Sequence, residues 1–136
     1  MAAERATDAL CAHRVLAVLE CRPSDDVVRA RAVQIAAGAG GYLTLVVVAP
    51  RPFPYLFAGS YCAPRASAEE LRMCAAATLR RATALVPAEI PLIAELDEGK
   101  PADVIRRRVE LAAHDLVVAR ACRGLAHVSD VPVIAC

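Results

Sequence analysis

Short, largely apolar runs of residues recur along the chain and alternate with segments of helical spacing. Five such runs lie at residues 15–19, 43–48, 92–96, 116–119 and 131–135. Runs of this length are typical of strands buried on both faces of a sheet. The pattern therefore predicts five strands, with the last at an edge because Pro132 interrupts its backbone donors.

The segments between the runs carry helix signals. Ser24 precedes two acidic residues and an apolar stripe of helical spacing, as an N-cap residue does. Ser67 and Glu70 resemble a capping box at the start of a second helix, which ends near residue 85. Pro101 suits the first turn of a third helix over residues 102–113. Three helices are therefore predicted between the first four strands.

Strands that alternate with helices predict right-handed crossovers and a mostly parallel sheet in an α/β fold. A chain of 136 residues fits one domain. We expect an N-terminal leader at residues 1–13 and a single domain over residues 14–136. Ligands of such sheets bind beyond the carboxyl ends of the strands, where the strand order reverses.

Composition narrows the classes of partner. The formal net charge is +1, aromatic residues make up 4% and Trp is absent, which argues against nucleic acid and against an anionic membrane surface. No apolar run reaches the length of a membrane span, and no secretory signal precedes the domain. We therefore expect a cytoplasmic protein whose six cysteines are mostly thiols.

The residues between the second strand and the second helix are rich in proline, which excludes a central strand. They also hold the aromatic residues Phe53, Tyr55, Phe57 and Tyr61. These side chains either cap a ligand or cover the edge of their own sheet, and the sequence favours neither.

Several stretches resemble the universal stress protein family. RVLAVLE at residues 14–20 is similar to the family's first strand, and LTLVVVAP at 43–50 to its second. EGKPADVIRRRVELAAHDLVVA at 98–119 resembles its third helix and fourth strand, and SDVPVIAC at 129–136 its closing strand. The resemblance implies a three-layer, five-stranded parallel sheet of order 3-2-1-4-5, of the adenine-nucleotide-hydrolase-like class. It also implies a homodimer that pairs through the last strand, here Val131–Cys136.

The sequence departs from the family pattern where ATP-binding members hold the phosphates. Those members carry a glycine-rich loop after the fourth strand, whose amides approach the phosphates. Residues 120–130 contain one glycine, Gly124, and the link to the last strand is shorter than a usual crossover. Glu20 also stands where the family has an Asp. ATP is therefore not expected as a cofactor, whereas AMP or a cyclic nucleotide remains possible.

A tentative ligand site follows from the resemblance and the strand ends. Glu20, Val48, Arg120 and Arg123 lie at or after the carboxyl ends of predicted neighbouring strands. A carboxylate can bind ribose hydroxyls, and arginines, including Arg22, can bind a phosphate or carboxylate. The alternative is that these charges are solvated at loop edges.

Cysteines suggest a different chemistry at the same edge. Cys21 and Cys122 follow strands that the family fold makes neighbours, and Cys62 and His127 could lie nearby. Such a group could form a disulfide or bind Zn²⁺. The alternative is that the cysteines pack as small apolar side chains, and no metal site is predicted from their spacing.

No catalytic constellation is visible. His127, Ser129 and Asp130 are too close in sequence for triad geometry, and His13 and His114 are predicted to be turn or surface residues. We therefore expect a non-enzymatic, dimeric regulatory or binding module of the universal stress type, without ordinary ATP binding. A binder of AMP or a cyclic nucleotide and a thiol or metal module remain the alternatives.

Overall fold

The computed structural model describes residues 13–49, 68–120, 127–128 and 131–136. In these residues the elements run, in chain order, β1 (Arg14–Leu19), α2 (Asp25–Ala39), β2 (Tyr42–Ala49), α3 (Ala68–Ala84), β3 (Leu92–Glu98), α4 (Pro101–Leu111), β4 (Leu116–Ala119), β5 (His127–Val128) and β6 (Val131–Ala135). The predicted leader and the proline-rich segment lie outside the described residues.

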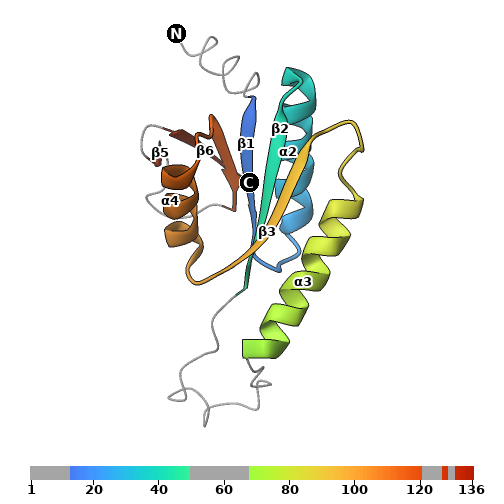
Figure 1. Ribbon diagram of the computed structural model, residues 1–136, viewed down its shortest axis with the longest axis vertical. Coiled ribbons are helices and arrows are strands. Elements are labelled where there is room, and N and C mark those ends of the chain that lie inside the picture. The colour runs from blue at the N-terminus through green and yellow to red at the C-terminus, as the bar shows by residue number, and fades with distance from the viewer. Residues whose placement is uncertain (1–12, 50–67, 121–126, 129–130) are drawn as a thin grey trace.

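The strands form one sheet of order β3-β2-β1-β4-β6-β5 (Figure 1). The first five of these are mutually parallel, as the register shows: Leu19 pairs with Val47, and Ala17 pairs with Val118. The predicted parallel order 3-2-1-4-5 is therefore confirmed. β1 and β4 are neighbours although most of the chain separates them, which is where the strand order reverses.

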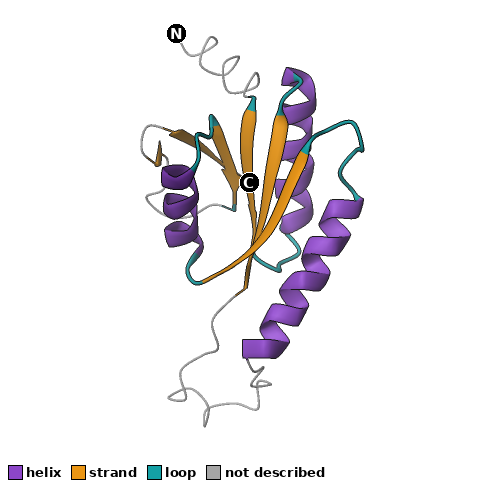
Figure 2. Cartoon of the chain, in the orientation of Figure 1, coloured by secondary structure: helices purple, strands orange, loops and turns teal. Residues whose placement is uncertain are grey.

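Helices cover the two faces of the sheet unequally (Figure 2). α2 and α3 pack on one face, against side chains such as Leu19, Leu45 and Leu116. α4 packs on the other face through Val104 and Ile105, which are completely buried. Strand side chains alternate between the two apolar clusters, because successive residues of a strand point to opposite faces. This accounts for the apolar runs of β1, β2 and β4. The prediction of burial on both faces is wrong for the edge strand β3, most of whose residues are exposed.

The last strand, β6, is at the edge of the sheet over only part of its length. The two-residue β5, which the sequence did not predict, pairs antiparallel outside β6 at Val131 and Pro132. The prediction that Pro132 marks an outer edge is therefore wrong for the start of β6. β5 lies outside these two residues, and no second strand pairs with Val133–Ala135 on that side within the described chain.

A buried histidine, His114, lies near the end of the sheet where the parallel strands β2 and β4 begin. His114 was predicted to be a turn or surface residue, but it is only 8% exposed. Its Nδ1 lies 3.2 Å from the carbonyl oxygen of Ala112, and its Nε2 lies 3.2 Å from the hydroxyl of Thr44 on β2. Since a carbonyl can only accept, Nδ1 carries the proton, and the neutral ring accepts at Nε2 from Thr44. His114 therefore joins the α4–β4 turn to β2.

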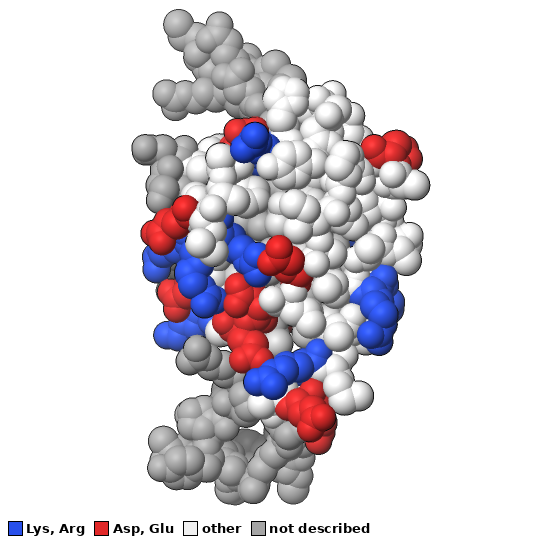
Figure 3. All heavy atoms as spheres, viewed as in Figure 1, with Lys and Arg blue, Asp and Glu red and all other residues white. Residues whose placement is uncertain are grey.

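The arginines of α4 form ion pairs with the edge strand β3. Arg107 contacts Asp97 at 3.0 Å, and Arg108, whose side chain is 17% exposed, contacts Glu95 and Asp97. Arg108 is therefore held against β3 and not left in solvent. Figure 3 shows basic and acidic side chains interspersed over this region. Charged side chains along β3 also protect an exposed edge from pairing with other chains.

Candidate functional site

Three of the predicted ligand residues come together where β2, β1 and β4 end. Glu20 directly follows β1, Val48 is the second-last residue of β2, and Arg120 directly follows β4. The pairs Leu19 with Val47 and Ala17 with Val118 place these positions at the same edge of the sheet. Adjacent strands lie about 4.8 Å apart, so the three positions span neighbouring strands. This is the edge where the strand order reverses, as ligand sites of parallel sheets require.

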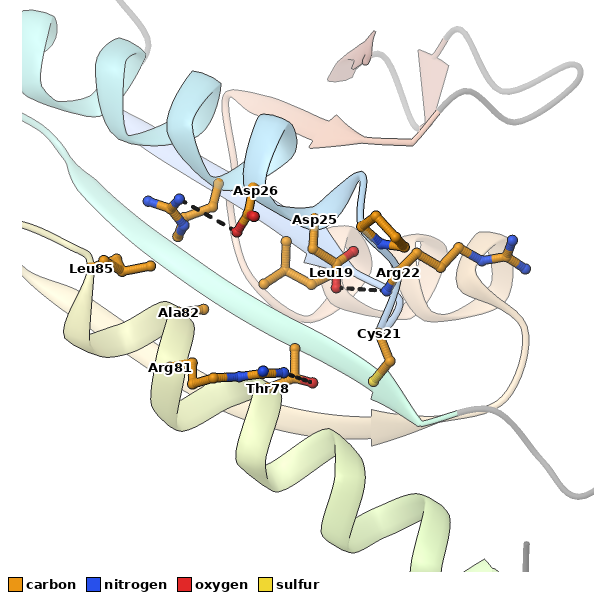
Figure 4. Close-up of a pocket in the computed structure, with 11 residues that line it drawn as sticks. Leu19, Cys21, Arg22, Asp25, Asp26, Thr78, Arg81, Ala82 and Leu85 are labelled. Atoms are coloured by element: carbon orange, nitrogen blue, oxygen red, sulfur yellow. Dashed lines mark hydrogen bonds and ion pairs between the residues drawn. The ribbon is translucent and has the colours of Figure 1, made fainter. Parts of the chain in front are cut away.

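The turn that carries Glu20 is fixed by one carboxylate. The Oδ1 atom of Asp25 accepts from the amide of Glu20 at 2.9 Å, and its Oδ2 accepts from the amide of Arg22 at 3.1 Å (Figure 4). Ser24, the predicted capping residue, makes no side-chain capping hydrogen bond. Asp25 therefore accepts hydrogen bonds from two residues that precede it in the sequence, and these bonds order the segment between β1 and α2.

Cys21 occupies an unusual backbone position within this turn. Its φ is 60°, in the left-handed region that glycine adopts easily and other residues rarely do. The two amides that Asp25 binds flank this residue on either side. The side chain of Cys21 is thus held in one direction by a strained backbone and a fixed turn.

The candidate ligand residues differ in exposure. The Val48 side chain is 2% exposed and belongs to the apolar cluster under α4. Val48 would therefore contact a ligand mainly through its backbone. Glu20 is half-buried, whereas Arg22 and Arg120 are exposed. A carboxylate and exposed arginines at one edge suit a ligand with hydroxyls at one end and an anionic group at the other. Arg123 lies outside the described residues.

A cavity of about 440 Å³ lies on the other side of the same turn. Its walls come from the β1–α2 turn, the first turns of α2, and α3 (Figure 4). The lining includes Cys21, Arg29, Thr78 and Arg81. Sequence reasoning missed the contribution of α3, because helical spacing gives no signal of which helix faces this turn.

The environment of the Cys21 thiol comes mainly from α3. Burial raises the pKa of the Cys21 thiol, and a hydrogen bond with the Thr78 side chain lowers it in part. Cys21 and Thr78 line the same cavity. Cys62 and Cys122, predicted as its partners, and the side chain of His127 fall outside the described residues. Within the described ranges, no three His, Cys, Asp or Glu side chains are grouped to hold a metal ion.

None of the helices in the described part of the chain has the length and apolar character needed to cross a membrane.

Comparisons with known proteins give the family whose fold this is. No family model matches the chain, and no curated protein matches it. A universal stress protein solved in complex with cAMP is 21% identical, covers 79% of this chain and 72% of its own, and superimposes with a TM-score of 0.51. A universal stress protein family member from Arabidopsis thaliana, solved with AMP bound, is 14% identical, with 89% and 88% coverage and a TM-score of 0.53. At these identities the likeness concerns the fold, and this chain has the fold of the universal stress proteins.

Proposed function

We propose that the protein is a non-enzymatic binding module of the universal stress type whose ligand is an adenine nucleotide with a single phosphate, AMP or cyclic AMP. The observation that carries this proposal is the meeting of Glu20, Val48 and Arg120 at one edge of the sheet, at the reversal of strand order. The Glu20 carboxylate would accept from the ribose hydroxyls, the end of β2 would border the adenine, and Arg120 would pair with the phosphate.

The two structural neighbours support the choice of ligand. One was solved in complex with cAMP and the other with AMP bound, and both share this fold. Neither ligand has a β- or γ-phosphate, so neither needs a long phosphate-binding loop.

The connection between β4 and β6 supports one phosphate over three. Residues 120–130 must join two parallel neighbours, and residues 127–128 within this link are already a strand. A parallel crossover ordinarily needs a dozen or more residues, usually with a helix, and residues 120–130 are fewer than that. With Gly124 as the link's only glycine, close approach of the backbone to a triphosphate is not favoured.

A homodimer through β6 is part of the proposal. The Cys136 amide donates to the Ala119 carbonyl on β4 at 2.9 Å, and backbone groups of a strand alternate in direction. Val133 and Ala135 therefore direct their backbone groups away from β4. A second copy that pairs there in a two-fold arrangement would satisfy these groups in both chains.

Thermal unfolding tests the ligand. Ligand at ten times its dissociation constant stabilises a protein by about 1.4 kcal/mol, or roughly 4–6 °C for a domain of this size. We expect AMP or cyclic AMP to raise the melting temperature, and Glu20→Gln and Arg120→Gln to reduce that rise. Glu89→Gln, at an exposed turn residue, is the matched control and should leave it intact.

Two results would contradict the proposal. An unchanged melting temperature with millimolar AMP and cyclic AMP would remove the nucleotide. Light scattering after size-exclusion chromatography tests the dimer separately, and a monomer at high protein concentration would remove the pairing through β6.

A further inference from the structure

Two cysteines from distant parts of the sequence lie on the two elements that border one cavity, the β1–α2 turn and α3. Cys21 lines this cavity together with Thr78 and Arg81 of α3 (Figure 4). Cys74 lies one turn before Thr78, whose hydroxyl is 3.1 Å from the Cys74 carbonyl oxygen. Residues four apart lie on the same face of a helix, so Cys74 lies on the α3 face that borders Cys21. Both cysteines are free thiols in the structure.

Their surroundings differ in a way that suits stepwise oxidation. Cys74 is exposed and Cys21 is half-buried, so an oxidant in solution reaches Cys74 first. Burial raises the pKa of the Cys21 thiol, so Cys21 stays protonated and less reactive toward the oxidant than an exposed thiolate would be. Arg81, which lines the same cavity, donates to the Thr78 hydroxyl at 3.4 Å. A half-buried, less reactive thiol is thus available to resolve the exposed thiol that oxidises first.

The turn aims the Cys21 side chain at α3. A residue without functional demands at a φ of 60° would be expected to be glycine, and Asp25 binds the amides on both sides of this position. Figure 4 shows the sulfur of Cys21 directed from the turn toward α3. Cys74 is on a helix surface and can change rotamer at low cost.

We propose that Cys21 and Cys74 form a redox pair that a hydroperoxide converts into a disulfide linking the β1–α2 turn to α3. The Cys74 thiolate attacks one peroxide oxygen, which breaks the O–O bond and yields a Cys74 sulfenic acid and water when the oxidant is hydrogen peroxide. The Cys21 thiolate then attacks the Cys74 sulfur, and the hydroxyl leaves as a second water once protonated. The two thiols lose two electrons in total, which the peroxide accepts. This pairing differs from the link between Cys21 and Cys122 that the strand order alone suggested, and it does not depend on nucleotide binding.

Peptide mapping of the full-length protein tests the pairing directly. Reduced protein is treated with hydrogen peroxide, remaining thiols are alkylated, and the chain is digested with trypsin without reductant. Because Arg22 precedes Pro23 and resists cleavage, Cys21 falls in the peptide 15–29 and Cys74 in the peptide 73–80, each with one cysteine. We expect these peptides to appear cross-linked, lighter than their sum by two hydrogen atoms, and to separate after reduction.

Variants show whether the pair is specific. Cys74→Ser should abolish the cross-link and leave Cys21 alkylatable, whereas Cys136→Ser, at another exposed thiol, should leave the cross-link unchanged. Trapping of the sulfenic acid with dimedone at Cys74 reports the first step in each folded variant.

The proposal is overturned if wild-type protein accumulates Cys74 sulfinic acid while Cys21 remains free. It is equally overturned if Cys21 is found cross-linked to Cys62 or Cys122 instead. Both outcomes are read from the wild-type digest, so they do not depend on the folding of any variant.

Discussion

Replacement of Asp25 by alanine should destabilise the protein more than its position near a surface would suggest. The side chain accepts hydrogen bonds from the amides of Glu20 and Arg22, at 2.9 and 3.1 Å. A net contribution of about 1 kcal/mol for each bond, with about 0.3–1 kcal/mol from an acidic residue in the first helical turn, gives a loss of about 2–3 kcal/mol for Asp25→Ala.

Asp26→Ala is the matched control for this prediction. Asp26 is also acidic and also in the first turn of α2, but its side chain is 82% exposed and pairs with Arg29 at 3.6 Å. Exposed ion pairs of this kind contribute about 0–1 kcal/mol, so Asp26→Ala should cost about 1 kcal/mol or less. The comparison removes the shared effect of the helix dipole and isolates the two bonds to the turn.

Urea unfolding measures the difference. With a slope of about 2 kcal/mol per molar urea, Asp25→Ala should lower the midpoint by about 1 M and Asp26→Ala by less than half of that. The ligand response offers a second readout, since a loosened turn no longer positions Glu20. Equal losses of stability in the two variants would refute the conclusion that Asp25 orders the turn.

Three further outcomes follow from single sites. Burial lowers the pKa of His114 below its usual value, so the unfolded state binds the proton first as pH falls below about 6.5. The free energy of unfolding, measured by urea titration at each pH, should therefore decline from pH 7.5 to 5. It should decline less steeply in His114→Gln. Cys21→Gly should be more stable than Cys21→Ala by about 1 kcal/mol, because only glycine adopts the φ of 60° without strain. If chemical denaturation found the alanine variant more stable than the glycine variant, that backbone geometry would be contradicted. Ile105→Ala should lower the free energy of unfolding by about 2–5 kcal/mol, because the side chain is completely buried. Leu111 on the same helix is 81% exposed, so Leu111→Ala should change it by under about 0.5 kcal/mol. Similar losses for both variants would show that α4 does not pack as described.

The sequence was sufficient for the architecture because its signals are local. The run at 116–119 is apolar at every position, and the run at 43–48 is apolar except for Thr44, since both faces of β2 and β4 are covered. Pro101 begins α4 as predicted. Strand order came from the resemblance rather than from the pattern, because periodicity does not reveal which strands pair.

The candidate site was only partly predictable, because its key contacts join distant or unremarkable residues. Glu20 and Arg120 could be placed at strand ends from the pattern alone. The role of Asp25 resembles that of any acidic residue in a first helical turn, and nothing in the sequence indicates that it bonds backward to Glu20 and Arg22. The nearness of Cys74 to Cys21 depends on how α3 is rotated against β1, which is a property of the packed core. His114 was misjudged because a polar residue in a turn is usually exposed, whereas Thr44 here supplies a buried partner.

Calorimetric titration of the protein with AMP and then with ATP tests the central claim most directly. The account predicts saturable binding of AMP and an affinity for ATP no higher than that for AMP, because residues 120–130 are short and contain a single glycine, unlike a phosphate-binding loop. A tenfold preference for ATP, about 1.4 kcal/mol, would require favourable contacts to the β- and γ-phosphates and would contradict the account.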